Sequence, residues 1–180
     1  MSSPSLQSHI GQRLHVSAEI DPAKTAQLIV DFLQQYLDYA GAAGYVLGVS
    51  GGQDSTLCAR LAQMAVEAYT RHTGKSTALW AMRLPCGVQS DEADALLALD
   101  FIRPTRVVVW NIQEAVEASA RAFEKATGTC ISDYHKGNIK ARERMIAQYA
   151  VAGQHGLLVL GTDHAAEAVT GFFTKHGDGA

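Results

Sequence analysis

The sequence predicts an α/β protein with a doubly wound parallel sheet and helices on both faces of that sheet. Short, nearly continuous apolar runs at about 45–49, 105–110 and 157–160 are typical of strands buried on both sides. These runs alternate with longer segments whose apolar residues recur at helical spacing. Strands that alternate with helices in this way favour a parallel sheet joined by right-handed crossovers.

The first expected helix follows a polar, serine-rich arm that covers residues 1–20. Asp21 is a favoured N-cap, and Pro22 stands at the first helical position, where its missing N–H has no helical partner to lose. The glycine-containing stretch 41–44 ends the helix. The apolar residues at helical spacing are Leu28, Ile29, Phe32, Leu33, Tyr36 and Leu37.

The rest of the chain continues the alternation of strand and helix. The expected strands cover about 45–49, 77–83, 105–110 and 157–160. The expected helices cover about 55–73, a segment that begins behind Ser90, about 113–126 and about 138–153. One face of the helix at 55–73 carries Leu57, Leu61, Met64, Ala65 and Ala68. Behind Ser90, Asp91 and Glu92 lie in the first turn, where the helix dipole favours acidic side chains.

Composition limits the class of protein. The chain has 180 residues, of which 47% are hydrophobic, and its net charge is −3. This length suits one globular domain, which we expect to span residues 21–180 behind the arm. A chain without an excess of basic residues is a poor match for nucleic acid, and no apolar run has the length of a membrane span. We therefore expect neither a nucleic-acid partner nor a membrane.

Cysteine usage indicates the compartment. Cys58, Cys86 and Cys130 are odd in number and lack C-x-x-C spacing. The chain does not begin with a basic segment followed by an apolar one, so we expect no secretion signal. Both observations favour reduced thiols in a cytoplasmic protein. The seven histidines show no spacing typical of a zinc site.

A polar, glycine-rich loop joins the first strand to the following helix. Gly48 and Val49 end the strand, and the loop then reads S-G-G-Q-D-S over residues 50–55. Its adjacent glycines let backbone N–H groups approach an anion, and the following helix directs its positive end at the same point. A carboxylate beside phosphates is unfavourable unless a cation lies between them, so Asp54 predicts a magnesium ion. The loop therefore predicts a site for nucleotide phosphates and magnesium.

Other phosphate-binding patterns do not fit this loop. It lacks the lysine of G-x-x-x-x-G-K-[ST], and it does not match G-x-G-x-x-G. Ordinary turn chemistry is the alternative, with Asp54 or Ser55 acting only as a helix cap. Arg83 ends the second strand, while Thr162 and Glu167 follow the fourth. In parallel sheets ligands bind at the carboxyl edge, so these positions favour a functional loop.

The S-G-G-x-D-S loop resembles the pyrophosphate loop of the adenine-nucleotide α-hydrolase superfamily, whose members cleave ATP between its α- and β-phosphates. Three further segments resemble the ammonia-dependent NAD synthetases: R-L-P-C-G-V-Q at 83–89, N-I-K-A-R-E-R-M at 138–145, and the stretch from G-T-D-H-A-A-E to G-F-F-T-K at 161–175. The resemblance covers about residues 21–180. It implies a Rossmann-like adenine-nucleotide α-hydrolase fold and a homodimer with helices at its interface.

The resemblance also implies a ligase that converts deamido-NAD, ATP and ammonia to NAD, AMP and pyrophosphate through an acyl-adenylate. The short arm leaves no room for a glutaminase segment, so free ammonia is the expected nitrogen donor. The implied magnesium ligands are Asp54 and Glu167, and the implied contacts to deamido-NAD are Arg142 and Lys175. The implied ATP contacts are Gly48, Val49, Ser50, Gly51, Gly52, Gln53, Asp54, Ser55, Arg83 and Thr162.

Four of these polar residues also have simpler interpretations. Arg83 can be a surface charge at the end of a strand, and Thr162 can be the N-cap of the next helix. Glu167 can be a solvated helix residue. Arg142 lies in a run of charged residues that is typical of a solvated helix face.

Three aromatic residues near the end of the chain are left without a firm role. Phe172 and Phe173 fit either the wall of a nicotinate pocket or the core. His164 is interpreted as a residue at the start of a helix.

Two other functions remain open at this stage. One is another adenylating enzyme of the superfamily, such as an amidotransferase synthetase module or a tRNA-thiolating enzyme, although a thiolating enzyme usually has a basic surface and paired cysteines. The other is an ATP-binding module without catalysis. Members of the NAD synthetase family continue well beyond the glycine-rich segment at 177–179. We therefore expect the C-terminal part of the domain to be missing and these 180 residues to be nearly inactive on their own.

Overall fold

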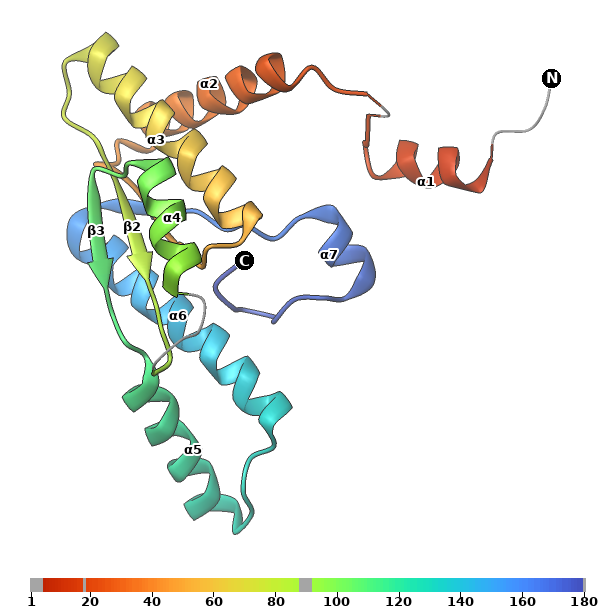
Figure 1. The fold of residues 1–180 in the computed structure, drawn as a ribbon, viewed down its shortest axis with the longest axis vertical. Helices are drawn as coiled ribbons and strands as arrows, with labels where there is room; N and C mark the ends of the chain where they lie inside the picture. Colours follow the sequence, from red (N-terminus) through yellow and green to blue (C-terminus); the bar gives the residue numbers. More distant parts are fainter. Residues whose placement is uncertain (1–4, 18, 88–91, 180) are drawn as a thin grey trace.

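The computed structural model describes residues 5–17, 19–87 and 92–179. Four strands of this part of the chain form one sheet in the order β3-β2-β1-β4, and every neighbouring pair is parallel. Figure 1 shows β2 and β3 side by side and pointing the same way. The strands are β1 (Gly44–Gly48), β2 (Ala78–Arg83), β3 (Arg106–Val109) and β4 (Leu157–Val159). The helices are α1 (Leu6–Arg13), α2 (Pro22–Ala40), α3 (Gln53–Thr73), α4 (Glu92–Ile102), α5 (Gln113–Thr127), α6 (Asp133–His155) and α7 (Ala165–Thr170).

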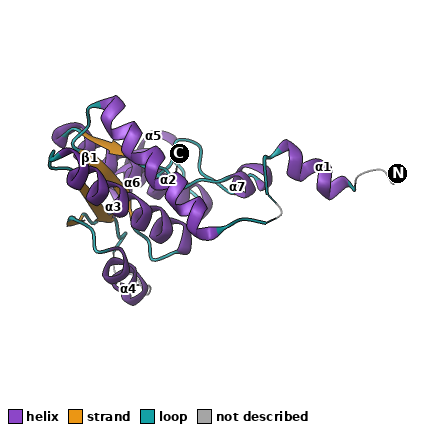
Figure 2. Cartoon of the chain, turned by 90° about the horizontal axis from the view of Figure 1, so that it is seen from above, coloured by secondary structure: helices purple, strands orange, loops and turns teal. Residues whose placement is uncertain are grey.

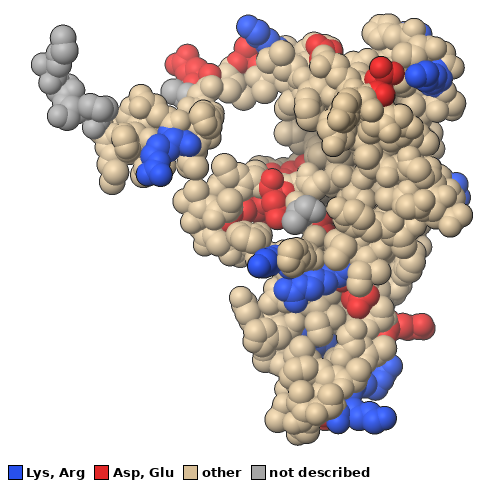
Figure 3. All heavy atoms as spheres, turned by 180° about the vertical axis from the view of Figure 1, so that it is seen from behind, with Lys and Arg blue, Asp and Glu red and all other residues tan. Residues whose placement is uncertain are grey.

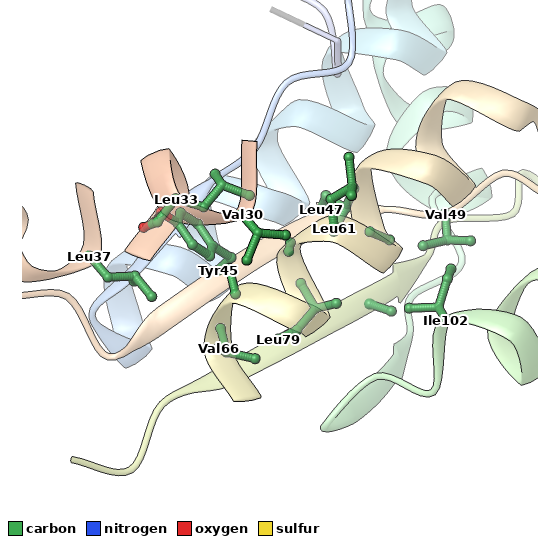
Figure 4. Packing of buried hydrophobic residues seen from close by; sticks show 14 of the residues in the cluster. Val30, Leu33, Leu37, Tyr45, Leu47, Val49, Leu61, Val66, Leu79 and Ile102 are labelled. Carbon is green, nitrogen blue, oxygen red and sulfur yellow. Dashed lines mark hydrogen bonds between the residues drawn. The ribbon is translucent and has the colours of Figure 1, made fainter. Parts of the chain in front are cut away.

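Helices cover both faces of the sheet, as the sequence predicts. Successive side chains of a strand point to opposite faces. Tyr45 and Leu47 of β1 accordingly pack with residues of α2, α3 and α4, whereas Val46 packs with residues of α5 and α6. Figure 4 shows the first of these clusters, where Val30 and Leu33 of α2 meet Tyr45. The Tyr45 hydroxyl donates a hydrogen bond to the Leu33 carbonyl at 2.7 Å, so its polar end is satisfied within the core. The doubly wound α/β fold is confirmed.

The expected limits of α2 are confirmed. The Asp21 carboxylate accepts hydrogen bonds from the N–H groups of Ala23 and Lys24 at 3.0 and 3.1 Å, with Pro22 in the first turn. Gly41 ends the helix in the left-handed conformation, with φ 62°. The expected apolar face is only partly buried. Leu33 and Leu37 lie in the core, while Leu28, Ile29, Phe32 and Tyr36 are exposed on the outer side.

Two helices begin earlier than the sequence predicts. α3 begins at Gln53 instead of near residue 55, because Gly52 takes the extended N-cap conformation. α6 begins at Asp133 instead of residue 138, because the Ser132 hydroxyl accepts a hydrogen bond from the His135 N–H. The expected start of the fourth helix at Ser90 and Asp91 lies outside the described residues. α4 is described from Glu92 onward.

The polar arm contains a helix that the sequence analysis did not predict. α1 is capped by Ser5, whose hydroxyl accepts a hydrogen bond from the Ser8 N–H at 3.2 Å. None of the residues of α1 is buried, and Figures 1 and 2 both show it apart from the body of the molecule. Across the described residues, no helix combines the length and the apolar character needed to cross a membrane.

Candidate functional site

The loop between β1 and α3 is held closed by two serine hydroxyls. Ser50 Oγ and Ser55 Oγ lie 3.2 Å apart, and the Ser50 oxygen also accepts a hydrogen bond from the Gly52 N–H at 3.2 Å. Ser55 Oγ in turn donates to the Gly52 carbonyl at 3.3 Å. Ser55 is buried, so the turn is anchored from within. These contacts give the short loop one defined shape.

Gly51 cannot be replaced by a larger residue without a shift of the backbone. Its φ of +92° is unfavourable for any residue with a side chain. A Cβ at this position would also lie 2.9 Å from the backbone nitrogen of Ala95 at the start of α4. The loop is therefore packed directly against α4, and glycine is required there for two independent reasons.

The N-terminus of α3 opens at this loop. Gly52 is the N-cap, and no side chain of the described residues forms a hydrogen bond to the N–H groups of the first turn. Those groups, together with the dipole of a 21-residue helix, favour an anion at this end. Asp54 lies in the same first turn, where its carboxylate is about half exposed. The end of the helix thus offers donors for phosphate and one carboxylate beside them.

Asp54 and Glu167 are brought together around His164. The imidazole Nε2 lies 3.9 Å from Asp54 Oδ2 and 3.8 Å from Glu167 Oε2. Glu167 also accepts a hydrogen bond from the His164 N–H at 3.3 Å, as part of the cap at the start of α7. His164 is therefore the N-cap of α7, and the interpretation of Thr162 as the N-cap is wrong. The Glu167 side chain is partly buried, with 26% of its surface exposed.

The donor set suits magnesium bound jointly with phosphate. No group of three or more His, Cys, Asp or Glu side chains among the described residues is arranged to hold a metal by itself. Magnesium, however, is commonly held by one or two carboxylates plus phosphate oxygens and water. Asp54 and Glu167 supply two carboxylates beside the anion-binding end of α3. The residues present therefore fit a magnesium ion that arrives with a nucleotide.

Arg83 is buried at the carboxyl end of β2. Its side chain is only 10% exposed, and its Nη1 lies 3.0 Å from Oε1 of Glu92. The interpretation of Arg83 as a surface charge is therefore wrong. The ion pair holds the guanidinium in place, and Arg83 lines a cavity at the carboxyl ends of the strands.

A cavity of about 330 Å³ opens at the carboxyl ends of β1 and β2 and just beyond β4. Its lining includes six residues that the sequence analysis assigned to ATP: Gly48, Val49, Ser50, Ser55, Arg83 and Thr162. The other predicted ATP residues, Gly51, Gly52, Gln53 and Asp54, continue the loop outside this lining. On the opposite side of the molecule from the view in Figure 1, acidic side chains gather in a hollow, with basic side chains beside them (Figure 3).

Arg142 and Lys175 also lie together. Arg142 Nε donates a hydrogen bond to the Lys175 carbonyl at 3.2 Å, and Thr174 Oγ1 donates to Asn138 Oδ1 at 2.9 Å. Both contacts fasten the segment after α7 to α6. Arg142 is therefore more than a solvated helix residue, although it and Lys175 are exposed. They lie outside the lining of the cavity.

Comparison with known proteins identifies the family. The family model described as NAD synthase matches residues 25–180. The chain belongs to the NAD synthase family. It is 55% identical over 176 residues to an NH(3)-dependent NAD(+) synthetase of Halalkalibacterium halodurans, a match that covers 97% of this chain and 65% of that protein. It is 58% identical to the enzyme of the same name from Bacillus pumilus, covering 97% of this chain and 64% of the relative. The chain therefore spans somewhat less than two thirds of these relatives.

Solved structures of the NAD synthase family have the same fold. The NAD+ synthetase of Burkholderia pseudomallei superposes with a TM-score of 0.88 at 44% identity, covering 99% of this chain and 68% of that one. A protein named NMN synthetase, from Francisella tularensis, superposes with a TM-score of 0.72 at 35% identity, covering 90% and 63%. The Rossmann-like α/β class implied by the loop is thus confirmed.

The cavity of this NAD synthase family member also contains polar residues that the sequence analysis did not assign. These are Arg144, Gln148, Asp163 and Asp178. Burial raises the pKa of the Asp178 carboxyl, although nearby Arg144 acts in the opposite direction. Burial and the neighbouring Glu167 likewise raise the pKa of Asp163. Arg144 and Gln148 lie four residues apart, so their spacing places both on one face of α6 and was the signal available in the sequence.

The segment after α7 closes one side of the cavity in this family member. The Asp163 N–H donates a hydrogen bond to the Gly179 carbonyl at 3.0 Å.

Both Phe172 and Phe173 are exposed, with 79% and 49% of their surfaces accessible, so the core alternative for these two residues is wrong.

Proposed function

We propose that this protein acts in ammonia-dependent NAD synthesis, converting deamido-NAD, ATP and ammonia to NAD, AMP and pyrophosphate. The observation that carries the proposal is the meeting of two carboxylates, Asp54 and Glu167, beside an anion-binding loop whose Ser50 and Ser55 line a cavity. The names of relatives that are 55–58% identical support the same reaction. Three free cysteines accord with a reducing compartment, and we place the reaction in the cytoplasm.

Activation of the carboxylate comes first. An oxygen of the nicotinate carboxylate attacks the α-phosphorus of ATP, and the bond from that phosphorus to pyrophosphate breaks. The Gly51 N–H, the hydroxyls of Ser50 and Ser55 and the first-turn N–H groups of α3 receive the departing pyrophosphate, while the Gly52 N–H holds Ser50 in place. Groups fixed in advance around a developing charge stabilise the transition state without having to reorganise, so the closed loop is suited to this step.

Asp54 and Glu167 hold magnesium in this proposal. A bound magnesium ion neutralises charge on the pyrophosphate oxygens. The two carboxylates come from different elements, α3 and α7, so the metal site forms only when both elements are in place. His164 keeps Glu167 oriented through the backbone hydrogen bond at the cap.

ATP contacts Arg83 and Thr162 from the cavity side. Arg83 approaches as a fixed cation because Glu92 holds its guanidinium. Deamido-NAD is assigned to Arg142 and Lys175, which lie together outside the cavity.

In the second step the ammonia nitrogen attacks the carbonyl carbon of the acyl-adenylate. The bond to the AMP oxygen breaks, and the nitrogen loses a proton to give the amide.

A homodimer is part of the proposal. The outer face of α2 exposes Leu28, Phe32, Tyr36 and Tyr39, with accessible fractions of 61%, 59%, 45% and 87%. An apolar strip of this kind on one helix is typical of a surface that another protein covers. A second copy of the chain, packed through α2, is the partner we propose.

The test is a set of reactions with ATP, magnesium and ammonium, each given a different acceptor, and it uses the chain continued to the full length of its relatives. Deamido-NAD should support release of pyrophosphate and formation of NAD. Because one structural relative is named NMN synthetase, nicotinate mononucleotide belongs in the same set. Faster turnover of the mononucleotide would change the assigned substrate. Pyrophosphate release that does not depend on either acceptor would contradict the proposal.

A further inference from the structure

Gln148 of α6 is a buried polar residue whose side-chain amide forms a hydrogen bond through its oxygen but not through its nitrogen. Its surface is 1% exposed. Its Oε1 accepts a hydrogen bond from the Gly48 N–H at 2.9 Å. Its Nε2 is the one buried side-chain nitrogen or oxygen atom, within the described residues, that has no hydrogen-bond partner. The bond from Gly48 fixes which end of the amide is the oxygen, so the free end is a donor.

A free buried donor of this kind is unusual. Leaving an amide N–H without a partner inside a protein is costly, and most buried polar groups of native proteins are paired. Gln148 therefore calls for an acceptor that the chain itself does not supply. The residue lines the cavity at the carboxyl ends of the strands, which is where such an acceptor can enter.

Gly48 keeps the space beside this donor open. A Cβ added at Gly48 would lie 3.5 Å from Gln148 Nε2 and 3.4 Å from Leu84 Cδ1. Both are ordinary contact distances, so alanine fits there but would occupy space next to the amide. The other lining residues near this end of the sheet include Met82, Leu84 and Leu160, which are apolar.

We propose that Gln148 binds the nucleoside part of the nucleotide, with Nε2 donating a hydrogen bond to an acceptor atom of the base or the ribose. The inference rests on the proposed function, because it requires ATP in this cavity. Phosphate is already served by the loop at 50–55 and the end of α3, which offer several N–H groups and hydroxyls. Gln148 instead contributes one neutral donor to a lining that mixes apolar side chains with charged ones such as Arg144 and Asp178, and a neutral donor suits the edge of a base or a sugar hydroxyl.

The same side chain links the nucleoside to the phosphate loop. Gly48 lies two residues before Ser50, at the end of β1, and Gln148 Oε1 holds its N–H. A nucleoside bound to Nε2 would therefore be held at a fixed distance from the start of the loop. This makes Gln148 both a ligand-binding residue and a positioning residue for the loop.

The experiment compares ATP with inorganic pyrophosphate, each with magnesium, by isothermal titration. Gln148→Met removes both hydrogen bonds. Gln148→Glu keeps an oxygen for Gly48 and, once ionised, removes the donor; the titrations are run several pH units above the ordinary glutamate pKa, because burial raises the pKa at this position. Gln148→Glu should bind ATP about tenfold more weakly and keep pyrophosphate within about twofold, because one hydrogen bond to the nucleoside is lost. Gln148→Met should weaken the binding of both ligands, because it also releases the Gly48 N–H that positions the loop. Gln154→Met, an exposed change on the same helix, should alter neither affinity.

Two analogues separate ligand binding from a structural role. If the acceptor is on the ribose, the difference between the unaltered chain and Gln148→Glu should vanish with 2′- or 3′-deoxy-ATP. If it is on the base, the difference should vanish with a deaza analogue. Unchanged ATP affinity in Gln148→Glu, or equal losses for ATP and pyrophosphate, would overturn the inference and leave the proposed function standing. Failure of the unaltered chain to bind ATP would overturn both.

Discussion

Arg83 Nη1 and Glu92 Oε1 lie 3.0 Å apart, and the two partners differ sharply in exposure. The arginine side chain is 10% exposed and lines the cavity, whereas the glutamate side chain is 57% exposed on α4. A half-exposed ion pair adds little to stability, about 0–1 kcal/mol. Its effect is instead to fix the direction of a cation that faces the proposed nucleotide.

Glu92→Gln should therefore weaken ATP binding by about three- to tenfold, because the guanidinium loses its charged anchor. The midpoint of thermal unfolding should change little. Titration with ATP beside a thermal scan measures both effects, and Glu114→Gln on α5 serves as the control for loss of a surface carboxylate. ATP affinity equal to that of the unaltered chain would mean that Arg83 does not need its partner.

Gly51→Ala tests the shape of the loop. The φ of +92° and the 2.9 Å approach to the Ala95 nitrogen both oppose a side chain. We expect a loss of about 1–3 kcal/mol in the free energy of unfolding, with weaker binding of pyrophosphate. Gly137→Ala in α6 is the matched control, because no atom lies within 4 Å of the added Cβ. It should gain about 0.5–1 kcal/mol from helix propensity. Similar stability of the two variants would contradict the assigned strain.

Much of the fold could be predicted from local sequence. The N-cap at Asp21, the apolar run of β1 and the glycine loop are short-range features, because each depends on neighbouring residues. Their positions in the structure agree with prediction to within one or two residues. The edge at which the loop lies then follows from the general properties of parallel sheets, whereas the strand order β3-β2-β1-β4 comes from the structure.

The parts that could not be predicted depend on contacts far apart in the sequence. Gln148 meets Gly48 across one hundred residues, and Asp163 meets the backbone of Gly179. Neither contact leaves a local pattern. The periodicity of α2 predicts an apolar face but does not indicate which part of that face packs against the sheet. Phe32 and Leu33 both belong to the predicted face, yet Leu33 is buried and Phe32 is exposed.

In the chain continued to the full length of its relatives, Asp54→Asn should reduce pyrophosphate release by at least about a hundredfold, because a charged group at the reacting phosphates is removed. Asp54 lies in the first turn of α3, so the change should also cost about 0.3–1 kcal/mol of stability through the helix dipole. Glu114→Gln, in the first turn of α5, should show that same small cost with no effect on the reaction. Rates of pyrophosphate release and thermal unfolding decide the matter. Retained turnover in Asp54→Asn would remove Asp54 from the proposed metal site.

Phe32→Glu tests the proposed dimer. The Phe32 and Tyr36 rings lie with centroids 5.9 Å apart on the exposed side of α2, so a carboxylate placed there would be unfavourable in a dry interface. We expect the unaltered chain to sediment as a dimer and Phe32→Glu as a monomer at the same concentration. Leu97→Glu, at a position that is also exposed but lies on α4, should remain dimeric. If both variants sediment as the unaltered chain does, α2 is not the interface.

Asp178 gives a prediction about pH, because burial raises the pKa of its carboxyl above the ordinary value. Arg144 and Asp163 are the charged groups that also act on it, with opposite signs. Below the ordinary aspartate pKa, the carboxyl is protonated in both the folded and unfolded states, so its burial does not lower the free energy of unfolding by burying a charge. As the pH rises, the Asp178 carboxyl ionises first in the unfolded chain, and stability falls until the pKa of the folded state has been passed.

Asp178→Asn removes this pH dependence of stability. It should match the unaltered chain in acid and exceed it in thermal stability at neutral pH. The exposed change Asp100→Asn should leave the profile as it is. Midpoints of thermal unfolding, measured from acid to neutral pH, provide the check. If Asp178→Asn were less stable than the unaltered chain at neutral pH, the ionised carboxylate would be held by favourable contacts such as Arg144.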